Sequence, residues 1–436
     1  MCYIITGVFI IASKTKVEQE KYYLRVPILL GIGGWTDALD DQIIQVFLPV
    51  LALYWGLSPV EAGLLVSFGF LGRVISGIFS GIIVDLIGRR KSFIIGNLVT
   101  AFVMIMYILS PSFSVFLVAR TLQGILSSWT SINNGAWIAE EAPPAKRQTW
   151  QSISGAISAV GIINTSVLLT ISGLVPWFTW KHAFLYIAVV DLIAAVCGLF
   201  LHESRMWLRR RELLKSGKLR EARVPLKKFL EPQIRKRFLL AAVLAAVGWF
   251  GLMFAPVPFM NYFGREVVKL SISFLGILGI ITAVLDIFVR GIVGPISDRI
   301  GRLNVLIIFS IILIVGSNIF HRTPILCGTG ETLTVMAFYT IFCIVYTSGF
   351  VAIGQTEGMW HSEIVPTGIR GSMQGFMSLI ANIVGFFGSA IIGFISMYIG
   401  LMNALPMVST IAAVIIILVA LIAKNLGLET KGKILD

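Results

Sequence analysis

Blocks of about twenty consecutive apolar residues constrain this 436-residue chain more than any other feature. A helical block of that length spans the ~30 Å hydrocarbon core of a bilayer. Hydrophobic residues make up 57% of the sequence and charged residues only 13%, which leaves too few charges to cover the surface of a soluble protein of this size. The sequence therefore predicts an all-α polytopic membrane protein.

The blocks predict twelve transmembrane helices in two six-helix bundles. The expected spans are 26–52, 59–84, 92–111, 114–139, 149–175, 180–201, 238–262, 271–296, 303–320, 333–358, 371–396 and 401–423. The expected segments are an N-terminal segment (1–25), a first bundle (26–202), a basic linker with short helices near Leu208–Leu214 and Leu219–Leu230 (203–237), a second bundle (238–424) and a tail (425–436). The role of the apolar residues 1–12, too short to span, stays open.

Lysine and arginine positions set the orientation. With the N-terminus inside, 28 of the 35 basic residues fall in cytoplasmic segments, 4 in external loops and 3 within spans. Because positive charge is retained on the cytoplasmic side, we expect both termini and the linker in the cytoplasm and the protein in the cell membrane. This distribution explains the net charge of +13 without nucleic acid as a partner. No structural disulfide is expected from the four cysteines.

The two halves repeat each other. "SGIIVDLIGRRK" after the second span and "VGPISDRIGRLN" after the eighth are offset by 213 residues, and E-x-x-P-x-x-x-R follows both the fourth and the tenth spans. Glu203-Ser and Glu429-Thr form a third pair. We expect inter-span charge networks that close the cytoplasmic side, in which the aspartates can cap neighbouring helices. The expected gate residues are Asp85, Arg89, Arg90, Glu140 and Arg147, with Asp298, Arg302, Glu363 and Arg370.

These signatures resemble the major facilitator superfamily over nearly the whole chain. "GIIVDLIGRRK" and "RTLQG" (120–124) match superfamily motifs, and "WHSEIVPTGIRG" (360–371), "ESRMWL" (203–208) and "LETKGKIL" (428–435) resemble those of sugar porters. The first span matches the D-x-x-D-x8-P pattern of aromatic-acid:proton symporters, whereas the seventh lacks the paired glutamines with which sugar porters hold hexose. The resemblance implies two pseudo-symmetric bundles that rock around one midplane site.

Three acidic residues lie within the first span, at Asp37, Asp40 and Asp41. The spacing i, i+3, i+4 places them on one side of the helix. Clustered carboxylates in a cavity of low dielectric favour the neutral form, so we expect at least one to exchange a proton near neutral pH. The resemblance implies pairing with Arg120 of the fourth span, since proton-coupled sugar porters pair an aspartate and an arginine there. Which aspartate carries the proton stays open.

Other polar residues within the spans are candidates for function, because ionisable groups in the bilayer are costly. Asp286 and Arg290, four residues apart, are expected to form an intrahelical ion pair, Asp191 is expected to be structural, and Arg73 has no evident partner. Glu357 is equally consistent with a substrate contact and with the gate. Aromatic rings with a few amides suit a ring-shaped polar solute. The expected cavity residues are Trp35, Gln123, Trp129, Asn133, Asn134, Trp137, Trp249, Asn261, Tyr346, Gln355 and Glu357.

The function expected from these features is proton-coupled import of a small organic solute, an organic acid ahead of a sugar, by a monomer. An uncoupled facilitator of the same fold is the alternative, and a transporter-like membrane receptor is a less favoured one. The sequence carries no P-loop motif and no metal-ligand cluster, so we expect neither an enzyme nor a cofactor, and the proton gradient is the expected energy source.

Overall fold

The computed structural model describes residues 2–141, 147–216, 231–248, 257–365 and 370–431. Every regular element in this part of the chain is helical. The helices are α1 (Cys2–Trp55), α2 (Pro59–Ile87), α3 (Arg89–Ile108), α4 (Phe113–Glu141), α5 (Arg147–Leu174), α6 (Trp180–Leu199), α7 (Arg205–Lys215), α8 (Pro232–Gly248), α9 (Phe259–Glu266), α10 (Ile272–Ile300), α11 (Arg302–His321), α12 (Thr323–Leu326), α13 (Leu333–Glu363), α14 (Arg370–Ile399) and α15 (Leu401–Asn425).

The helices follow the expected spans closely. Among the described residues, nine are long and apolar enough to cross a membrane: α2, α3, α5, α6, α10, α11, α13, α14 and α15. The other three expected spans correspond to α1, to α4 and to α8 with α9. In the linker, α7 matches the first expected short helix, and the second falls on residues 217–230, outside the described part.

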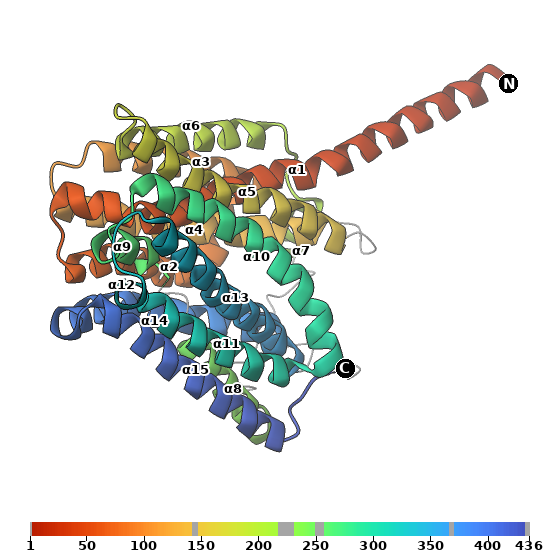
Figure 1. Cartoon of the computed structure of the whole chain (residues 1–436). Helices are drawn as coiled ribbons and strands as arrows, with labels where there is room; N and C mark the ends of the chain where they lie inside the picture. Colours follow the sequence, from red (N-terminus) through yellow and green to blue (C-terminus); the bar gives the residue numbers. More distant parts are fainter. Residues whose placement is uncertain (1, 142–146, 217–230, 249–256, 366–369, 432–436) are drawn as a thin grey trace.

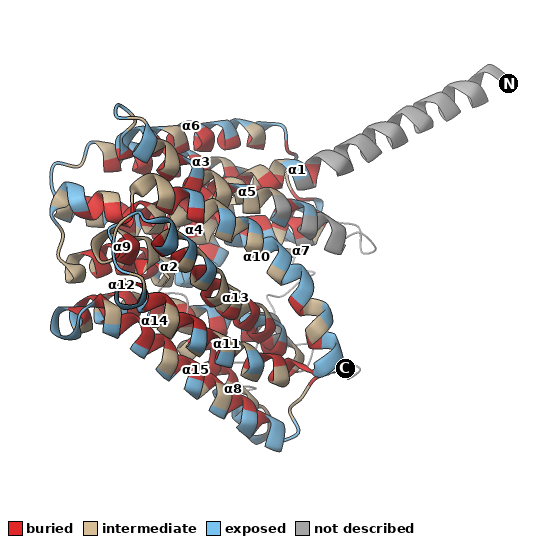
Figure 2. Ribbon diagram, in the orientation of Figure 1, coloured by how far each residue is buried: buried red, intermediate tan, exposed pale blue. Residues whose placement is uncertain are grey.

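Outward faces of the bundle carry apolar side chains. On α6, Leu185, Val189, Leu192 and Val196 are 44–52% exposed and follow the i, i+4, i+7, i+11 spacing of one helix face. Exposed positions of this kind lie along the outer helices, while buried positions face the interior (Figure 2). A continuous apolar stripe of this kind is stable against lipid, as expected for a membrane-spanning bundle.

Helices α1–α6 form one half of the molecule and α8–α15 the other, and small residues let the halves touch. A Cβ added at Gly63 of α2 would lie 2.3 Å from the carbonyl oxygen of Ser389 in α14. A Cβ at Gly276 of α10 would lie 2.5 Å from the backbone nitrogen of Thr170 in α5. Such small residues allow backbones to approach closely within a membrane.

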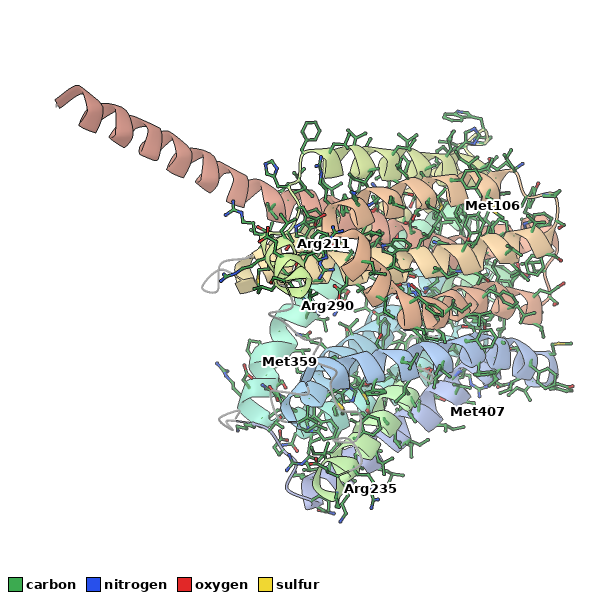
Figure 3. The ribbon with its side chains drawn as sticks, turned by 180° about the vertical axis from the view of Figure 1, so that it is seen from behind. Met106, Arg211, Arg235, Arg290, Met359 and Met407 are labelled. Atoms are coloured by element: carbon green, nitrogen blue, oxygen red, sulfur yellow. The ribbon has the colours of Figure 1, made fainter. Side chains whose placement is uncertain are left out.

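These contacts lie at one end of the molecule. They involve the first two turns of α2 and α10, the last two turns of α5 and the last three turns of α14. At the opposite end, where α7 lies, the two groups of helices diverge (Figure 1). Seen from behind, Met106 and Met407 lie toward the first end and Arg211 and Arg235 toward the second (Figure 3). We call these the closed end and the linker end.

Candidate functional site

The acidic cluster of α1 faces α4. Asp37 accepts a hydrogen bond from the Thr130 hydroxyl through Oδ1 and one of 3.4 Å from the Asn134 amide through Oδ2. Asp40 is only 2% exposed, and its Oδ1 has no hydrogen-bond partner among the described residues. A buried polar atom without a partner is costly, so this position marks a candidate site.

Arg120 lies in the same buried cluster but is bridged to α1 by an amide. Its Nη1 donates to Oε1 of Gln123 at 2.7 Å, and the Gln123 amide nitrogen donates to the backbone carbonyl of Asp40. The Tyr107 hydroxyl donates to the same Oε1 at 2.7 Å. Space for the guanidinium comes from Gly69 of α2, where a Cβ would lie 2.6 Å from Nε of Arg120.

The direct ion pair expected between Arg120 and a first-span aspartate is absent from the described contacts of this conformation. The carboxylate that does pair with an arginine is that of Asp41, which binds Nη2 of Arg73 in α2. The sequence offered no partner for Arg73, and the structure identifies Asp41 as its partner. Asp191 of α6 is fully buried, and neither of its carboxylate oxygens has a hydrogen-bond partner in the described structure.

A cavity of about 380 Å³ lies between the two halves. Its walls come from α1, α2 and α5 of one half and α9, α10 and α13 of the other. Asp41 and Arg73 face it from the first half. From the second half come Asp286 and Arg290, whose Nε lies 2.9 Å from Asp286 Oδ1, as the four-residue spacing predicts. The volume falls within the range of small-molecule sites.

Most of the expected cavity residues lie elsewhere in this conformation. Asn261 lines the cavity, while Trp137 packs edge-on against Phe93 and Tyr346 packs among aromatic rings of α11 and α13. Asn133 donates to the Arg89 carbonyl at 3.0 Å, which ties α4 to α3. The side chains of Trp137, Tyr346 and Asn133 are fully buried by helix packing in this conformation, and their contact with a solute stays a prediction.

Two of the remaining expected residues, Trp129 and Gln355, link neighbouring helices. The Trp129 indole donates to the Ser92 hydroxyl, and the Gln355 amide donates to the Arg290 carbonyl at 3.2 Å. Trp35 is partly exposed and its indole nitrogen lacks a partner in the described structure. Glu357 is 2% exposed, with its Oε1 3.8 Å from His361 Nε2. Trp249 lies outside the described residues.

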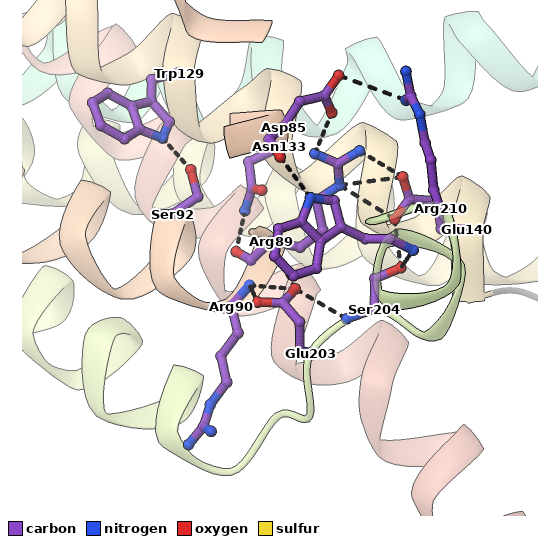
Figure 4. Close-up of polar contacts among 11 residues, drawn as sticks. Asp85, Arg89, Arg90, Ser92, Trp129, Asn133, Glu140, Glu203, Ser204 and Arg210 are labelled. Atoms are coloured by element: carbon purple, nitrogen blue, oxygen red, sulfur yellow. Dashed lines mark hydrogen bonds and ion pairs between the residues drawn. The ribbon is translucent and has the colours of Figure 1, made fainter. Parts of the chain in front are cut away.

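The first of the expected charge networks surrounds Arg89 at the linker end (Figure 4). Its guanidinium lies 2.7 Å from Asp85 and 2.6 Å from Glu140, so it joins α2, α3 and α4. Oε1 of Glu203 accepts the backbone N–H groups of Arg89 at 2.7 Å and of Arg90 at 3.2 Å. This carboxylate thus caps the N-terminus of α3, where the helix dipole favours negative charge.

The second half repeats this arrangement around Arg302. Its guanidinium lies 2.5 Å from Asp298 and 3.2 Å from Glu363, and Oε1 of Glu429 accepts the Arg302 backbone N–H at 2.9 Å. The Thr430 hydroxyl donates to Glu363 at 2.5 Å, and in the first half Ser204 donates to Glu140 at the same distance. The three duplicated signatures therefore meet in one network per half.

Two details differ from the sequence expectation. The helix caps are Glu203 and Glu429, whereas Asp85 and Asp298 pair with the arginine four residues later in the chain. In the sequence, the duplicated pair Glu203-Ser and Glu429-Thr was the signal from which these caps could have been predicted. The side chains of Arg147 and Arg370 lie outside the described part. Where described, each network stays within its own half.

The sequence also left several cavity residues unnamed. Polar groups of the wall that it did not single out are Gln42, Gln45, Ser166, Thr282, Tyr339, Thr347 and Ser348. Gln45 lies four residues after Asp41 on the same side of α1, so the acidic spacing itself pointed to it. Ser166 of the fifth span and Thr282 of the eighth carried no comparable signal.

Comparison with known proteins agrees with this architecture. Residues 30–389 match the Major Facilitator Superfamily. The chain is 25% identical to the arabinose-proton symporter of Bacillus subtilis, over 97% of this chain and 95% of that protein. It is also 25% identical to the cis,cis-muconate transport protein of Acinetobacter baylyi, over 83% and 84%. The crystal structure of a D-xylose-proton symporter superimposes with a TM-score of 0.73 at 16% identity, covering 91% of this chain and 97% of that one. The family match spans most of the chain and both halves of the fold, so this protein belongs to the Major Facilitator Superfamily.

Proposed function

We propose that this protein is a proton-coupled importer of a small organic solute that works by alternating access. The observation that carries the proposal is the buried cluster of Asp37, Asp40 and Arg120, held by Gln123 between α1 and α4. It combines the buried carboxyl of Asp40 and the partly buried carboxyl of Asp37 with the buried positive charge of Arg120. A cluster of this kind can bind a proton in one conformation and release it in the other.

The two ends of the molecule support alternating access. The halves meet at the closed end through glycines of α2 and α10 and diverge at the linker end. Basic residues gather at the linker end, in α7 and at the start of α8, which supports a cytoplasmic assignment of that end. On this assignment the conformation is inward-facing, both termini are cytoplasmic, and the protein lies in the cell membrane. We propose that it acts as a monomer without a cofactor.

An organic acid ranks ahead of a neutral sugar as the solute. The cavity holds two arginines, Arg73 and Arg290, and guanidinium groups match carboxylates in charge and in geometry. The muconate relative transports an acid by its name, while the arabinose relative transports a sugar, so both classes belong in the first screen. The alternative function is facilitated diffusion of the same solutes without proton coupling.

The test uses purified protein in proteoliposomes. Asp37→Asn, Asp40→Asn and Asp41→Asn are each compared with the wild type and with Glu212→Gln, a control on the exposed surface of α7. A pH gradient, acidic outside, should drive solute accumulation in the wild type and in the control. Accumulation should vanish in at least one aspartate variant while counterflow exchange persists. Undiminished accumulation in all three would refute the proton site, and uptake that ignores the pH gradient in the wild type would favour the facilitator.

A further inference from the structure

We infer that the solute is a dicarboxylate anion whose two carboxylates bind Arg73 and Arg290, one from each half of the protein. This inference rests on the proposed function and narrows it to one substrate class. It follows from the positions of the ion pairs Asp41–Arg73 and Asp286–Arg290, from the charge balance of the cavity and from the other residues of its wall.

The pairs lie at the middle of two equivalent helices. Helices α2 and α10 each have 29 residues, and Arg73 and Asp286 each follow the first residue of their helix by 14 positions. At 1.5 Å per residue both lie about 21 Å from the start of the helix, near the midplane of a bilayer. The repeat therefore places an arginine in one half where the other half has an aspartate. Each half completes its pair from a second position, Asp41 of α1 or Arg290 of α10.

Charged side chains cost free energy at this depth in a bilayer. Those that are present therefore mark candidate functional sites. Both pairs remain accessible to the cavity, with the Arg73 and Asp41 side chains 20% and 28% exposed and those of Arg290 and Asp286 50% and 23% exposed. Two half-open pairs on opposite walls suit a ligand that carries negative charge at both ends and replaces an aspartate at each arginine.

The rest of the wall fits a linear apolar segment between two carboxylates. Leu278, Val289, Phe350 and Val351 contribute apolar surface, and Ser166 and Thr282 contribute hydroxyls. A cavity of about 380 Å³ accommodates a short aliphatic or unsaturated chain.

Charge balance then sets the number of protons. The described cavity wall carries two arginines and two aspartates, so it is neutral as a whole, and a dianion would leave two uncompensated negative charges. Uptake of two protons by the aspartates of the cavity wall and of the adjoining buried cluster restores neutrality when substrate carboxylates take the guanidinium groups of Arg73 and Arg290 from Asp41 and Asp286. Other titratable groups near these positions are Tyr339 and Cys343 of the wall and Asp37, Asp40 and Arg120 of the adjoining buried cluster. We therefore expect electroneutral symport of two protons with one dianion.

Binding is tested first, on the purified full chain, by titration calorimetry with succinate, adipate and suberate and with their monomethyl esters. The wild type should bind one of the three diacids at least about tenfold more tightly than its monoester. Arg73→Gln and Arg290→Gln should each weaken that diacid by about 10- to 100-fold, since each removes one charged hydrogen-bonding partner. Arg322→Gln, on the exposed surface beyond α11, is the control and should bind as the wild type does.

Two results would overturn the inference: equal affinity for diacid and monoester, or wild-type diacid affinity in either cavity variant. Arg73→Lys and Arg290→Lys keep the charge and lose the planar fork, so they serve where a glutamine variant does not fold. Their diacid affinity should also fall, and wild-type affinity in the lysine variants would count against two guanidinium contacts.

Transport separates this inference from the proposed function. In proteoliposomes, diacid uptake should rise with an inward proton gradient and be insensitive to a potassium–valinomycin potential, because the expected cycle moves no net charge. Uptake driven by the potential would refute the stoichiometry. Proton-driven accumulation of a sugar or monocarboxylate without any diacid binding would leave the proposed function intact and overturn the dicarboxylate. A proton gradient that accumulates none of these solutes would count against both.

Discussion

Replacing Gly88 by alanine tests the architecture of the linker end most directly. Gly88 joins α2 to α3 with φ 97° and ψ 162°, a conformation that is almost exclusive to glycine. Forcing a residue with a side chain into this region costs about 1–3 kcal/mol. The added Cβ would lie 2.4 Å from Oε2 of Glu203, so the carboxylate must also move.

Displacing that carboxylate adds a second cost. Glu203 accepts the N–H groups of Arg89 and Arg90, and loss of a helix N-cap costs about 0.5–2 kcal/mol. If the two costs were independent, the free energy of unfolding would fall by roughly 1.5–5 kcal/mol. They act on the same contact, so we expect a value below their sum.

The assay is thermal unfolding of the detergent-purified full chain. Gly81→Ala is the matched control, since Gly81 lies seven residues earlier, within α2, and a Cβ there meets nothing within 4 Å. Alanine in a helix is favoured over glycine by about 0.8–1.0 kcal/mol, so the control should melt at or above the wild-type temperature. Gly88→Ala should melt clearly lower. Equal melting temperatures for the two variants would refute the cap and the backbone argument together.

Three other changes probe different parts of the fold. Gly63→Ala places a Cβ 2.3 Å from the Ser389 carbonyl, so labelling of cysteines introduced at the closed end should increase, whereas Gly77→Ala, with free space around it, should leave labelling unchanged. Glu203→Gln keeps an acceptor oxygen and removes the charge at the α3 N-terminus, so stability should fall by about 0.3–1 kcal/mol, measured as a lower melting temperature at low ionic strength. Asp191→Asn keeps the shape of a buried side chain that has no described hydrogen-bond partner, so the melting temperature should not fall, and a clear decrease would reveal a role for the carboxylate.

The positions of the helices could be predicted because a bilayer imposes a length on every apolar block. The expected span 180–201 and α6 (Trp180–Leu199) differ by two residues, and the eighth span differs from α10 by a few at its end. The seventh span was expected over 238–262, where the described residues form α8, up to Gly248, and α9, from Phe259. Residues 249–256 lie outside the described part, so the continuity of this span stays a prediction.

Contacts between side chains could be predicted only where the sequence is duplicated or the partners are close together in the chain. The pair of Asp286 and Arg290 follows from a spacing of four. The cap on α3 joins Arg89 to a residue 114 positions away, and charge alone does not distinguish Glu203 from Asp85 as its source. Likewise, composition places Trp137 on a cavity helix without telling which face it occupies, and the structure packs it against Phe93.

The positions of the charge networks and of the glycine contacts together explain how such a molecule could change conformation. Each network fastens helices of one half around one arginine, Arg89 or Arg302, and where described it makes no ion pair with the other half. Close contact between the halves occurs at the closed end, where glycines bring backbones together and Phe68 of α2 packs edge-on against Phe386 of α14, rather than through charged side chains. Breaking such contacts costs less than breaking buried ion pairs, because no charge is left unpaired. Each half is therefore braced to move as a unit, and rocking about the cavity would exchange the closed end with the linker end while both networks stay intact.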